Sequence, residues 1–371
     1  MTSWILIDFT VFIIVVGLAG FIIPQILLIA FRKKLFDEID PRKIHKGAVP
    51  RLGGIAFFPS ILFAILLMFG IGRRFIPEVM NDVLQTSLTG LCFIACAVVI
   101  LYLVGMADDL IGLKYKAKFV AQIFAASLII IGDIYVDNLH GFLWIHSMPF
   151  GMAVVLTAIL TVFIINAINL IDGIDGLASG LSAIACAFYG FVFVSADLHI
   201  YGMLAFATLG ALLPFFYYNV FGNAKKHSKI FMGDTGALSI GLILSVLSIR
   251  ICRIGDMTLD INPAVMAFAP LLIPGFDVVR VYLHRLKEHR NPFLPDKSHI
   301  HHKLLALGMK QSIAMPTIVC SSCLLILLNY LLGSVINVTF LFAIDMAIWV
   351  IANILLSRAI KRKNRVEEKL A

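Results

Sequence analysis

Residues 4–34 read WILIDFTVFIIVVGLAGFIIPQILLIAFRKK, and this stretch decides the fold class. The apolar run from Trp4 to Phe31 exceeds the roughly 20 residues that a helix needs to cross the hydrocarbon core of a bilayer. It is also too long for the apolar core of a cleaved signal peptide, and the basic triplet at 32–34 is typical of the inner end of a retained span. The stretch therefore predicts a transmembrane helix that is kept in the protein.

The rest of the chain shares this apolar character. Of the 371 residues, 60% are hydrophobic and 14% are charged, whereas about 25% of residues are charged in a typical soluble domain. Lipid is therefore the expected solvent, and we predict an all-α polytopic membrane protein. Eleven apolar runs are candidate transmembrane helices, at 4–31, 54–72, 87–106, 118–132, 151–170, 177–195, 201–221, 235–253, 264–282, 313–333 and 336–357. We expect one multi-span catalytic domain over 1–357 and a basic cytoplasmic tail over 358–371.

The basic residues indicate the orientation of these helices. With the N-terminus outside, 26 of the 30 Lys and Arg residues fall in inner segments, which is the excess that cytoplasmic loops carry. An N-out/C-in orientation follows, with the net charge of +8 on the cytoplasmic face. Beside a bilayer, such a face suits anionic headgroups and phosphate-bearing substrates better than nucleic acid.

Dense polar clusters all fall on the inner side of this map. Asp108 and Asp109 end the third span, where adjacent carboxylates repel each other and oppose the helix dipole. A cation or a basic group lying against them would relieve that cost, and Lys118 follows in the sequence. Lys46 and Arg51 lie in the first inner segment, where phosphate binding and a positive-inside anchor are both compatible with the pattern.

The run 166–176 reads NAINLIDGIDG. Its polar side chains recur at every third position, a spacing that keeps them roughly on one side of a helix or a 3₁₀ turn. Aligned oxygen-bearing side chains suit a hard cation such as Mg²⁺, or the hydroxyl and amide groups of a nucleoside. The four residues are Asn166, Asn169, Asp172 and Asp175.

Two further clusters supply an acid and a group of imidazoles. Asp234, in the segment MGDTG at 232–236, opens a span and suits either a cation or a helix N-cap. His299, His301 and His302 lie within four residues, but no Cys or spaced Glu accompanies them as a zinc site would require. Because imidazoles also bind phosphate oxygens, we favour an anion pocket.

These clusters together indicate a reaction class. Phosphoryl-type transfer needs mainly positioned reactants and neutralised charge. A divalent cation would bridge the pyrophosphate of a nucleotide-sugar, and a phosphate carried by a lipid would be the nucleophile. A lipid nucleophile explains why the site lies at the membrane surface, so we predict transfer of a phosphosugar from a nucleotide to a lipid phosphate.

From about residue 30 to about residue 312, the chain resembles the polyprenyl-phosphate N-acetylhexosamine-1-phosphate transferase superfamily, also called glycosyltransferase family 4. The resemblance rests on four motifs in the family's order: Asp108-Asp109, the run 166–176, the segment 232–236, and HIHH at 299–302. The HIHH spelling is similar to the WecA/TagO-like branch, whereas phospho-MurNAc-pentapeptide transferases have three consecutive histidines.

The resemblance implies a role for each matching position. Asp108 and Asp109 match paired aspartates proposed to deprotonate the lipid phosphate or to help place the metal. Asp234 matches a Mg²⁺ ligand and Asn169 a ligand in some members, with Mn²⁺ as an alternative metal. The implied substrate-binding residues are Lys46 and Lys118 at the floor of the site, Asp172 and Asp175 beside the nucleoside and sugar phosphate, Asn219 as a looser nucleotide-side match, and His299, His301 and His302.

The implied reaction moves N-acetylglucosamine-1-phosphate, or a related N-acetylhexosamine-1-phosphate, from a UDP-sugar to undecaprenyl phosphate in the bacterial inner membrane. UMP is released, and a lipid-linked cell-surface glycan begins. Two alternatives stay open, namely phospho-MurNAc-pentapeptide transfer and a secondary transporter, although only Asp345 lies deep within a predicted span. A homodimer and the identity of the direct base, Asp108 or Asp109, are also left open.

Overall fold

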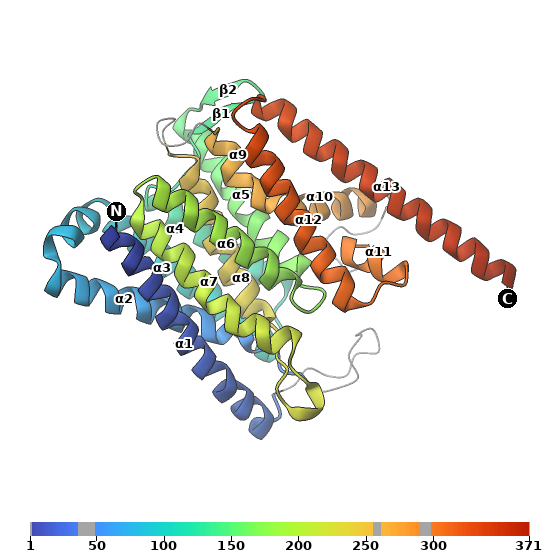
Figure 1. The fold of residues 1–371 in the computed structure, drawn as a ribbon, viewed down its shortest axis with the longest axis horizontal. Coiled ribbons are helices and arrows are strands. Elements are labelled where there is room, and N and C mark those ends of the chain that lie inside the picture. The colour runs from blue at the N-terminus through green and yellow to red at the C-terminus, as the bar shows by residue number, and fades with distance from the viewer. Residues whose placement is uncertain (1, 36–48, 255–260, 290–297, 371) are drawn as a thin grey trace.

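The computed structural model describes residues 2–35, 49–254, 261–289 and 298–370, and these are almost entirely helical (Figure 1). The helices are α1 (Thr2–Lys33), α2 (Phe57–Phe75), α3 (Pro77–Ile111), α4 (Tyr115–Ile131), α5 (Phe150–Ile171), α6 (Leu177–Ser195), α7 (His199–Val220), α8 (Gly233–Ile251), α9 (Pro263–Phe268), α10 (Leu272–Lys287), α11 (Ile300–Ala306), α12 (Gln311–Leu332) and α13 (Val338–Leu370). Three 3₁₀ turns, η1 (Gly53–Ala56), η2 (Ala224–Lys226) and η3 (Ala269–Leu271), and two strands, β1 (Asn138–Phe142) and β2 (Ile145–Ser147), complete the described elements.

Ten helical segments in the described part of the chain are long and apolar enough to cross a membrane. Each of them coincides with one of the eleven predicted runs. The remaining run, 118–132, forms α4, which has only 17 residues. The prediction of an all-α polytopic membrane protein is therefore confirmed, while the predicted count is one higher than the number of helices with full span length.

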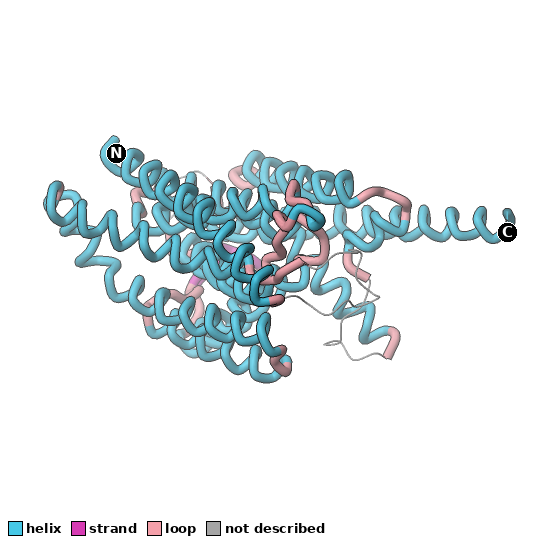
Figure 2. The backbone as a smooth tube through the Cα atoms, turned by 90° about the horizontal axis from the view of Figure 1, so that it is seen from below, coloured by secondary structure: helices cyan, strands magenta, loops and turns pink. Residues whose placement is uncertain are grey.

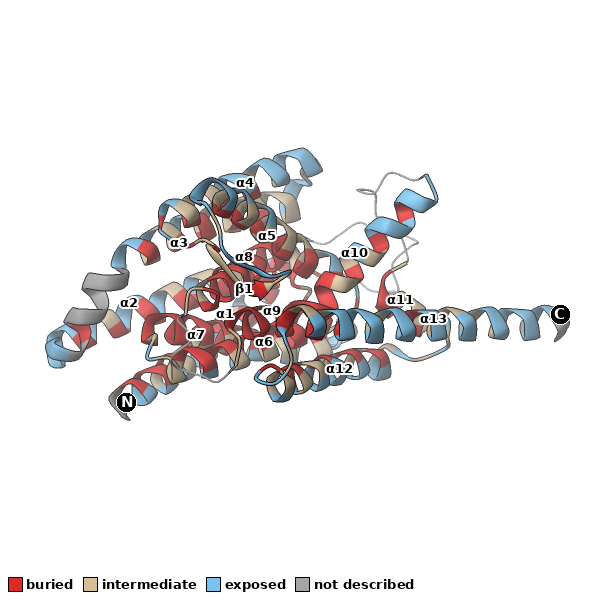
Figure 3. Cartoon of the chain, turned by 90° about the horizontal axis from the view of Figure 1, so that it is seen from above, coloured by how far each residue is buried: buried red, intermediate tan, exposed pale blue. Residues whose placement is uncertain are grey.

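Helix α8 lies at the centre of the bundle and is almost wholly buried (Figure 3). It packs against α3, α5, α6, α9 and η1, and its sequence is apolar on every side, as expected for a helix without a surface face. Glycines allow close approach at its N-terminal end. A Cβ on Gly54 would lie 2.2 Å from the Cα of Gly236, and one on Gly105 would lie 2.5 Å from the Cα of Thr235. The segments that carry the predicted site are thus held around the start of α8.

The peripheral helices present apolar surface to their surroundings. Helices α1, α6 and α7 pack side by side, and α12 contacts both α6 and α13. Figure 2 shows α13 projecting past the rest of the bundle towards the C-terminus. Large side chains such as Phe21, Val120 and Leu324 are about two-thirds exposed. So much apolar surface is unfavourable in water and is matched by lipid.

Three features go beyond the predicted pattern. The segment between α4 and α5 forms an antiparallel hairpin in which Asn138 of β1 faces Ser147 of β2. The span predicted at 264–282 is broken into α9, η3 and α10, because Pro270 and Pro274 lack the N–H that a continuous helix needs. Helix α13 continues unbroken to Leu370, so the predicted basic tail extends the last helix.

Candidate active site

The start of α8 is held by one of the two paired aspartates. The Asp109 carboxylate accepts hydrogen bonds from the backbone N–H of Asp234 (2.8 Å), from that of Thr235 (2.9 Å) and from the Thr235 hydroxyl (2.6 Å). Gly233 has a φ of +72°, and a Cβ at that position would lie 2.5 Å from the Asp109 carboxylate. An anion at this point satisfies free N–H groups and complements the helix dipole. Asp109 therefore anchors α8 with both of its oxygens.

The neighbouring Asp108 belongs to a network that joins four helices. Lys118 of α4 donates to Asp108 of α3 (3.1 Å) and to Asp234 of α8 (2.6 Å). The other oxygen of Asp234 accepts a hydrogen bond from the amide of Asn169 on α5 (3.1 Å). All of these side chains are partly buried. Residues that are far apart in the sequence thus place two carboxylates, an ammonium and an amide within one hydrogen-bonded cluster.

This cluster has the chemistry of a magnesium site. Mg²⁺ prefers oxygen ligands and commonly takes one or two carboxylates, completing its shell with water and substrate phosphates. Asp108, Asp234 and the amide oxygen of Asn169 offer that set. Nowhere in the described part of the chain do three or more His, Cys, Asp or Glu side chains form a cage on their own. The donor set therefore fits a cation that is held jointly with a phosphorylated substrate.

The turn between α5 and α6 is fixed by two contacts. Asp175 forms an ion pair with Lys229 (2.6 Å). Asn219 of α7 accepts a hydrogen bond from the N–H of Gly176 (2.6 Å) and donates one to the carbonyl of Ile230 (2.8 Å). The Asn219 amide, which the resemblance places on the nucleotide side, is therefore used to bridge the turn and the loop before α8.

Asp172 occupies the same turn with a different environment. Its side chain is accessible to solvent, but the surrounding protein removes part of its hydration and raises the pKa of its carboxyl to about 7. The negative charges of Asp234 and Asp175 act in the same direction, and Arg51 opposes them. A carboxyl protonated near neutrality can donate as well as accept hydrogen bonds.

The histidine segment packs against this turn. His301 is 1% exposed, and a Cβ on Gly173 would lie 2.1 Å from its Nε2. Burial and the neighbouring His302 and His299 lower the pKa of His301 to about 3, so its imidazole is neutral at physiological pH. Neither ring nitrogen of His301 has a hydrogen-bond partner in the described part of the chain. Buried ring nitrogens usually have a hydrogen-bond partner, so both nitrogens of His301 are unusual in having none among the described residues.

Helix α10 contributes a buried carboxylate that the sequence analysis missed. Asp277 is 0% exposed and accepts hydrogen bonds from Nδ1 of His299 (2.8 Å), from the N–H of Ile300 (3.0 Å) and from Arg280 (2.8 Å). Because a carboxylate only accepts, His299 carries a proton on Nδ1. Asp277 therefore ties the start of α11 to α10. An acidic residue within an apolar span was the available signal for a functional role.

The structure brings most of the predicted residues together. Asp108, Asp109, Lys118, Asn169 and Asp234 form one contact network, and His301 lies against the turn that carries Asp172 and Asp175. Asn166 does not join them, since its amide pairs with Gln122 of α4 (2.7 Å). Lys46 lies outside the described residues.

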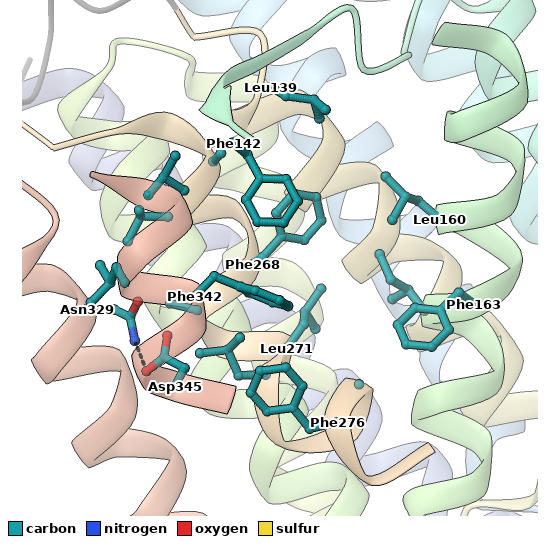
Figure 4. Close-up of a pocket in the computed structure, with 18 of the residues that line it drawn as sticks. Leu139, Phe142, Leu160, Phe163, Phe268, Leu271, Phe276, Asn329, Phe342 and Asp345 are labelled. Carbon is teal, nitrogen blue, oxygen red and sulfur yellow. Dashed lines mark hydrogen bonds between the residues drawn. The ribbon is translucent and has the colours of Figure 1, made fainter. Parts of the chain in front are cut away.

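A separate apolar cavity of about 320 Å³ lies between α5, α9, α10 and α13 (Figure 4). Its wall is built mainly from aromatic and aliphatic side chains, including Phe163, Phe268 and Phe342. Among the described residues that line it, Asp345 is the one carboxylate, and it accepts a hydrogen bond from the Asn329 amide (3.1 Å). The deep acidic residue of the last span is thus partnered by α12.

Comparison with known proteins shows which proteins this chain is similar to. The model of glycosyl transferase family 4 matches residues 91–252. A probable undecaprenyl-phosphate N-acetylglucosaminyl 1-phosphate transferase of Bacillus subtilis (strain 168) is 30% identical over 342 residues, which cover 88% of this chain and 82% of that protein. The undecaprenyl-phosphate alpha-N-acetylglucosaminyl 1-phosphate transferase of Salmonella typhi is 31% identical, with 80% and 76% covered. The protein of that name from Yersinia pestis is 29% identical, with 91% and 87% covered.

Proposed function

This chain belongs to glycosyl transferase family 4, and from that premise we propose that it transfers N-acetylglucosamine-1-phosphate from a UDP-sugar to undecaprenyl phosphate. UMP is the second product. The relatives named after the undecaprenyl-phosphate reaction support the acceptor and the sugar phosphate. The observation that carries the proposal is the network of Asp108, Lys118, Asp234 and Asn169 at the start of a buried helix.

The reaction exchanges one phosphorus–oxygen bond for another. An oxygen of the lipid phosphate attacks the β-phosphorus of the nucleotide-sugar, and the bond from that phosphorus to the oxygen bridging the α-phosphate breaks. The departing oxygen leaves as part of UMP. Mg²⁺, or Mn²⁺ in its place, would be held by Asp234 and Asn169 and would neutralise the pyrophosphate charge.

Asp108 is better placed than Asp109 to act on the lipid phosphate. Both oxygens of Asp109 already accept hydrogen bonds from the start of α8. One oxygen of Asp108 accepts a hydrogen bond from the N–H of Leu113 (2.6 Å), and the other faces the ammonium of Lys118, which Asp108 shares with Asp234. We assign Asp108 the removal of a proton from the lipid phosphate, and Lys118 the stabilisation of negative charge beside it.

The remaining polar groups would receive the donor. The Asp172–Asp175 turn and the adjoining His299–His302 segment lie next to each other, which suits a ligand that carries both a nucleoside and phosphates. In the N-out/C-in orientation this end of the bundle faces the cytoplasm. A multi-pass enzyme of the bacterial inner membrane would there start a lipid-linked cell-surface glycan.

A variant of Asp234 tests the assignment. Asp234→Asn should reduce Mg²⁺-dependent UMP release by about 100-fold or more, since one oxygen ligand and its charge are lost at the reacting centre. The assay uses membranes that contain the variant, undecaprenyl phosphate and a panel of UDP-N-acetylhexosamines, and the lipid product is identified by its mass. Asp197→Asn, in the turn between α6 and α7, removes a carboxylate that makes no contact with the cluster and should leave the rate unchanged.

Full activity of Asp234→Asn would refute the metal assignment. A lipid product formed only from the UDP-MurNAc-pentapeptide donor would instead favour phospho-MurNAc-pentapeptide transfer. Transport of a substrate into vesicles without UMP release would favour the transporter.

A further inference from the structure

A groove of about 520 Å³ lies between α10, α11 and α13, at the same end of the bundle as the candidate active site. Apolar side chains form its walls, among them Phe276 and Val279 of α10 and Trp349 and Val350 of α13. Lys303 of α11 closes it on the third side, where its ammonium donates hydrogen bonds to the side chains of Asn353 (3.0 Å) and Ser357 (3.1 Å). The groove is therefore enclosed by side chains of three helices.

The charged side chains among the described lining residues of this groove are all cationic. Its described lining residues include four cationic side chains and no carboxylate, and the cations are Arg280, Lys303, Arg358 and Lys361. Arg280 is neutralised by Asp277, which lies behind the wall. Burial and the nearby Arg280 lower the pKa of Lys303 to about 8, so an anion placed beside this ammonium would stabilise its charged form. Within the described residues, Arg358 and Lys361 make no ion pair that would compensate their charge.

The lining changes from apolar to cationic along α13. Met346, Trp349 and Val350 come first, the polar Asn353 and Ser357 follow, and Arg358 and Lys361 end the series. At 1.5 Å per residue this gradient extends over roughly 20 Å. An apolar lower part with a cationic rim matches a molecule that has an aliphatic chain and an anionic headgroup. At the edge of a bilayer, that description fits a lipid.

We propose that this groove binds the phosphate headgroup of an anionic phospholipid, with an acyl chain lying between α10 and α13. Arg358, Lys361 and Lys303 would contact the phosphate. The lipid would be resident and would not react, because the groove and the active site use different faces of α11. Lys303 and His301 are two residues apart, about 200° around a helix, and His301 is the one that packs against the Asp172–Asp175 turn.

The test compares two variants of α13 in the full-length protein. Arg358→Gln/Lys361→Gln removes two groove cations, whereas the control Arg362→Gln/Arg365→Gln removes two exposed cations of the same helix that do not line the groove. Delipidated protein in detergent is titrated with phosphatidylglycerol, and binding is followed by native mass spectrometry and by the shift in unfolding temperature. Phosphatidylethanolamine, inorganic phosphate and undecaprenyl phosphate are titrated in parallel.

We expect phosphatidylglycerol to bind wild type and control alike, and the groove variant about 30-fold more weakly, since each basic residue near a headgroup contributes a factor of about five. Equal weakening in the control variant would overturn the proposal, because it would indicate diffuse attraction by the basic helix. Equal binding of phosphatidylethanolamine, or an equal effect of inorganic phosphate, would overturn selection of an anionic lipid. Displacement of phosphatidylglycerol by undecaprenyl phosphate at a much lower concentration would make the groove an acceptor site instead. These readouts measure binding alone, so they are independent of the proposed reaction.

Discussion

Asp108 and Asp109 are adjacent in the sequence but have separate tasks in the structure. Successive residues of a helix point about 100° apart, so the two carboxylates of α3 meet different neighbours. Asp109 faces the N–H groups at the start of α8, and Asp108 faces Lys118. A sequence motif of two acids therefore contains one residue that anchors the start of α8 and one that shares the ammonium of Lys118 with Asp234.

Substitution of each acid in turn separates these tasks. Asp108→Asn should lose about 100-fold or more of the UMP-release rate while its unfolding temperature stays close to wild type. Asp109→Asn should lose activity and also lower stability by about 1–2 kcal/mol, since the anion at the start of α8 is lost. The measurements are the rate of UMP release and thermal unfolding in detergent. A stable Asp109→Asn variant beside an unstable Asp108→Asn variant would reverse the assignment.

At the residue scale, the sequence indicated which side chains gather at the start of α8 better than it indicated their partners. The sequence indicates Asp108, Asp234 and Asn169 because a polar side chain beside an apolar span is energetically unfavourable, and such residues usually have a function. Some of their contacts join segments that are far apart along the chain, such as Asn169 with Asp234 and Lys118 with Asp234. Such pairs depend on how helices pack in three dimensions, which local sequence does not encode. Asp277 was missed for the same reason, because its role depends on His299 lying opposite it.

At the scale of elements, the relation between α10 and α11 controls the donor side of the site. Asp277 holds the first residues of α11, and α11 carries His301 to the turn of Asp172 and Gly173. Because α11 has only seven residues, it has little helical stability of its own. Its position therefore depends on the contacts that Asp277 and the turn provide.

Replacement of Asp277 should act through this position. Asp277→Asn keeps the shape of the side chain but removes the negative charge to which three donors bond. Hydrogen bonds to a charged group contribute roughly 1.5–3 kcal/mol to stability, so the loss of the charge weakens the hold on α11. We expect the KM for the UDP-sugar to rise about 10-fold or more, while the KM for undecaprenyl phosphate changes little. Asp345→Asn is the matched control, since it alters another buried carboxylate of the bundle, whose partner among the described residues is Asn329. An equal rise of both KM values, or the same effect in the control, would mean that Asp277 supports the fold in general.

The elements themselves were largely predictable. Hydropathy is a property of each segment by itself, so the predicted runs became helical, although α4 is short and the run 264–282 is interrupted by η3. The break between α9 and α10 and the hairpin of β1 and β2 were not predicted. Pro270 and Pro274 marked the break, but proline is often tolerated within transmembrane helices where neighbouring groups satisfy the freed carbonyls. A hairpin of this size has no apolar periodicity of its own to reveal it.

At the scale of the whole molecule, the polar chemistry and most of the basic charge lie at one end of the bundle. Helix α4 starts near Lys118 and leads to the hairpin, and α5 returns from the hairpin to Asn169. Because α4 and α5 pack side by side, the hairpin lies at the end opposite the candidate active site. Helix α13 begins at Val338, and its last residues lie at the opposite end of the last span. These last residues carry the final group of basic residues.

The orientation of this asymmetric molecule decides whether the site can meet its donor, since nucleotide-sugars are made in the cytoplasm. The excess of basic residues predicts that the hairpin is outside and the end of α13 inside. Single cysteines can test this in a background lacking the six native ones. Ser147→Cys in β2 and Asn364→Cys in α13 replace exposed residues at the two ends. In intact cells, a membrane-impermeant maleimide should label Ser147→Cys and leave Asn364→Cys unlabelled, and after permeabilisation it should label both. Labelling of Asn364→Cys in intact cells would place the Asp108–Asp234 cluster outside, away from any cytoplasmic UDP-sugar, and would refute the proposed reaction together with the orientation.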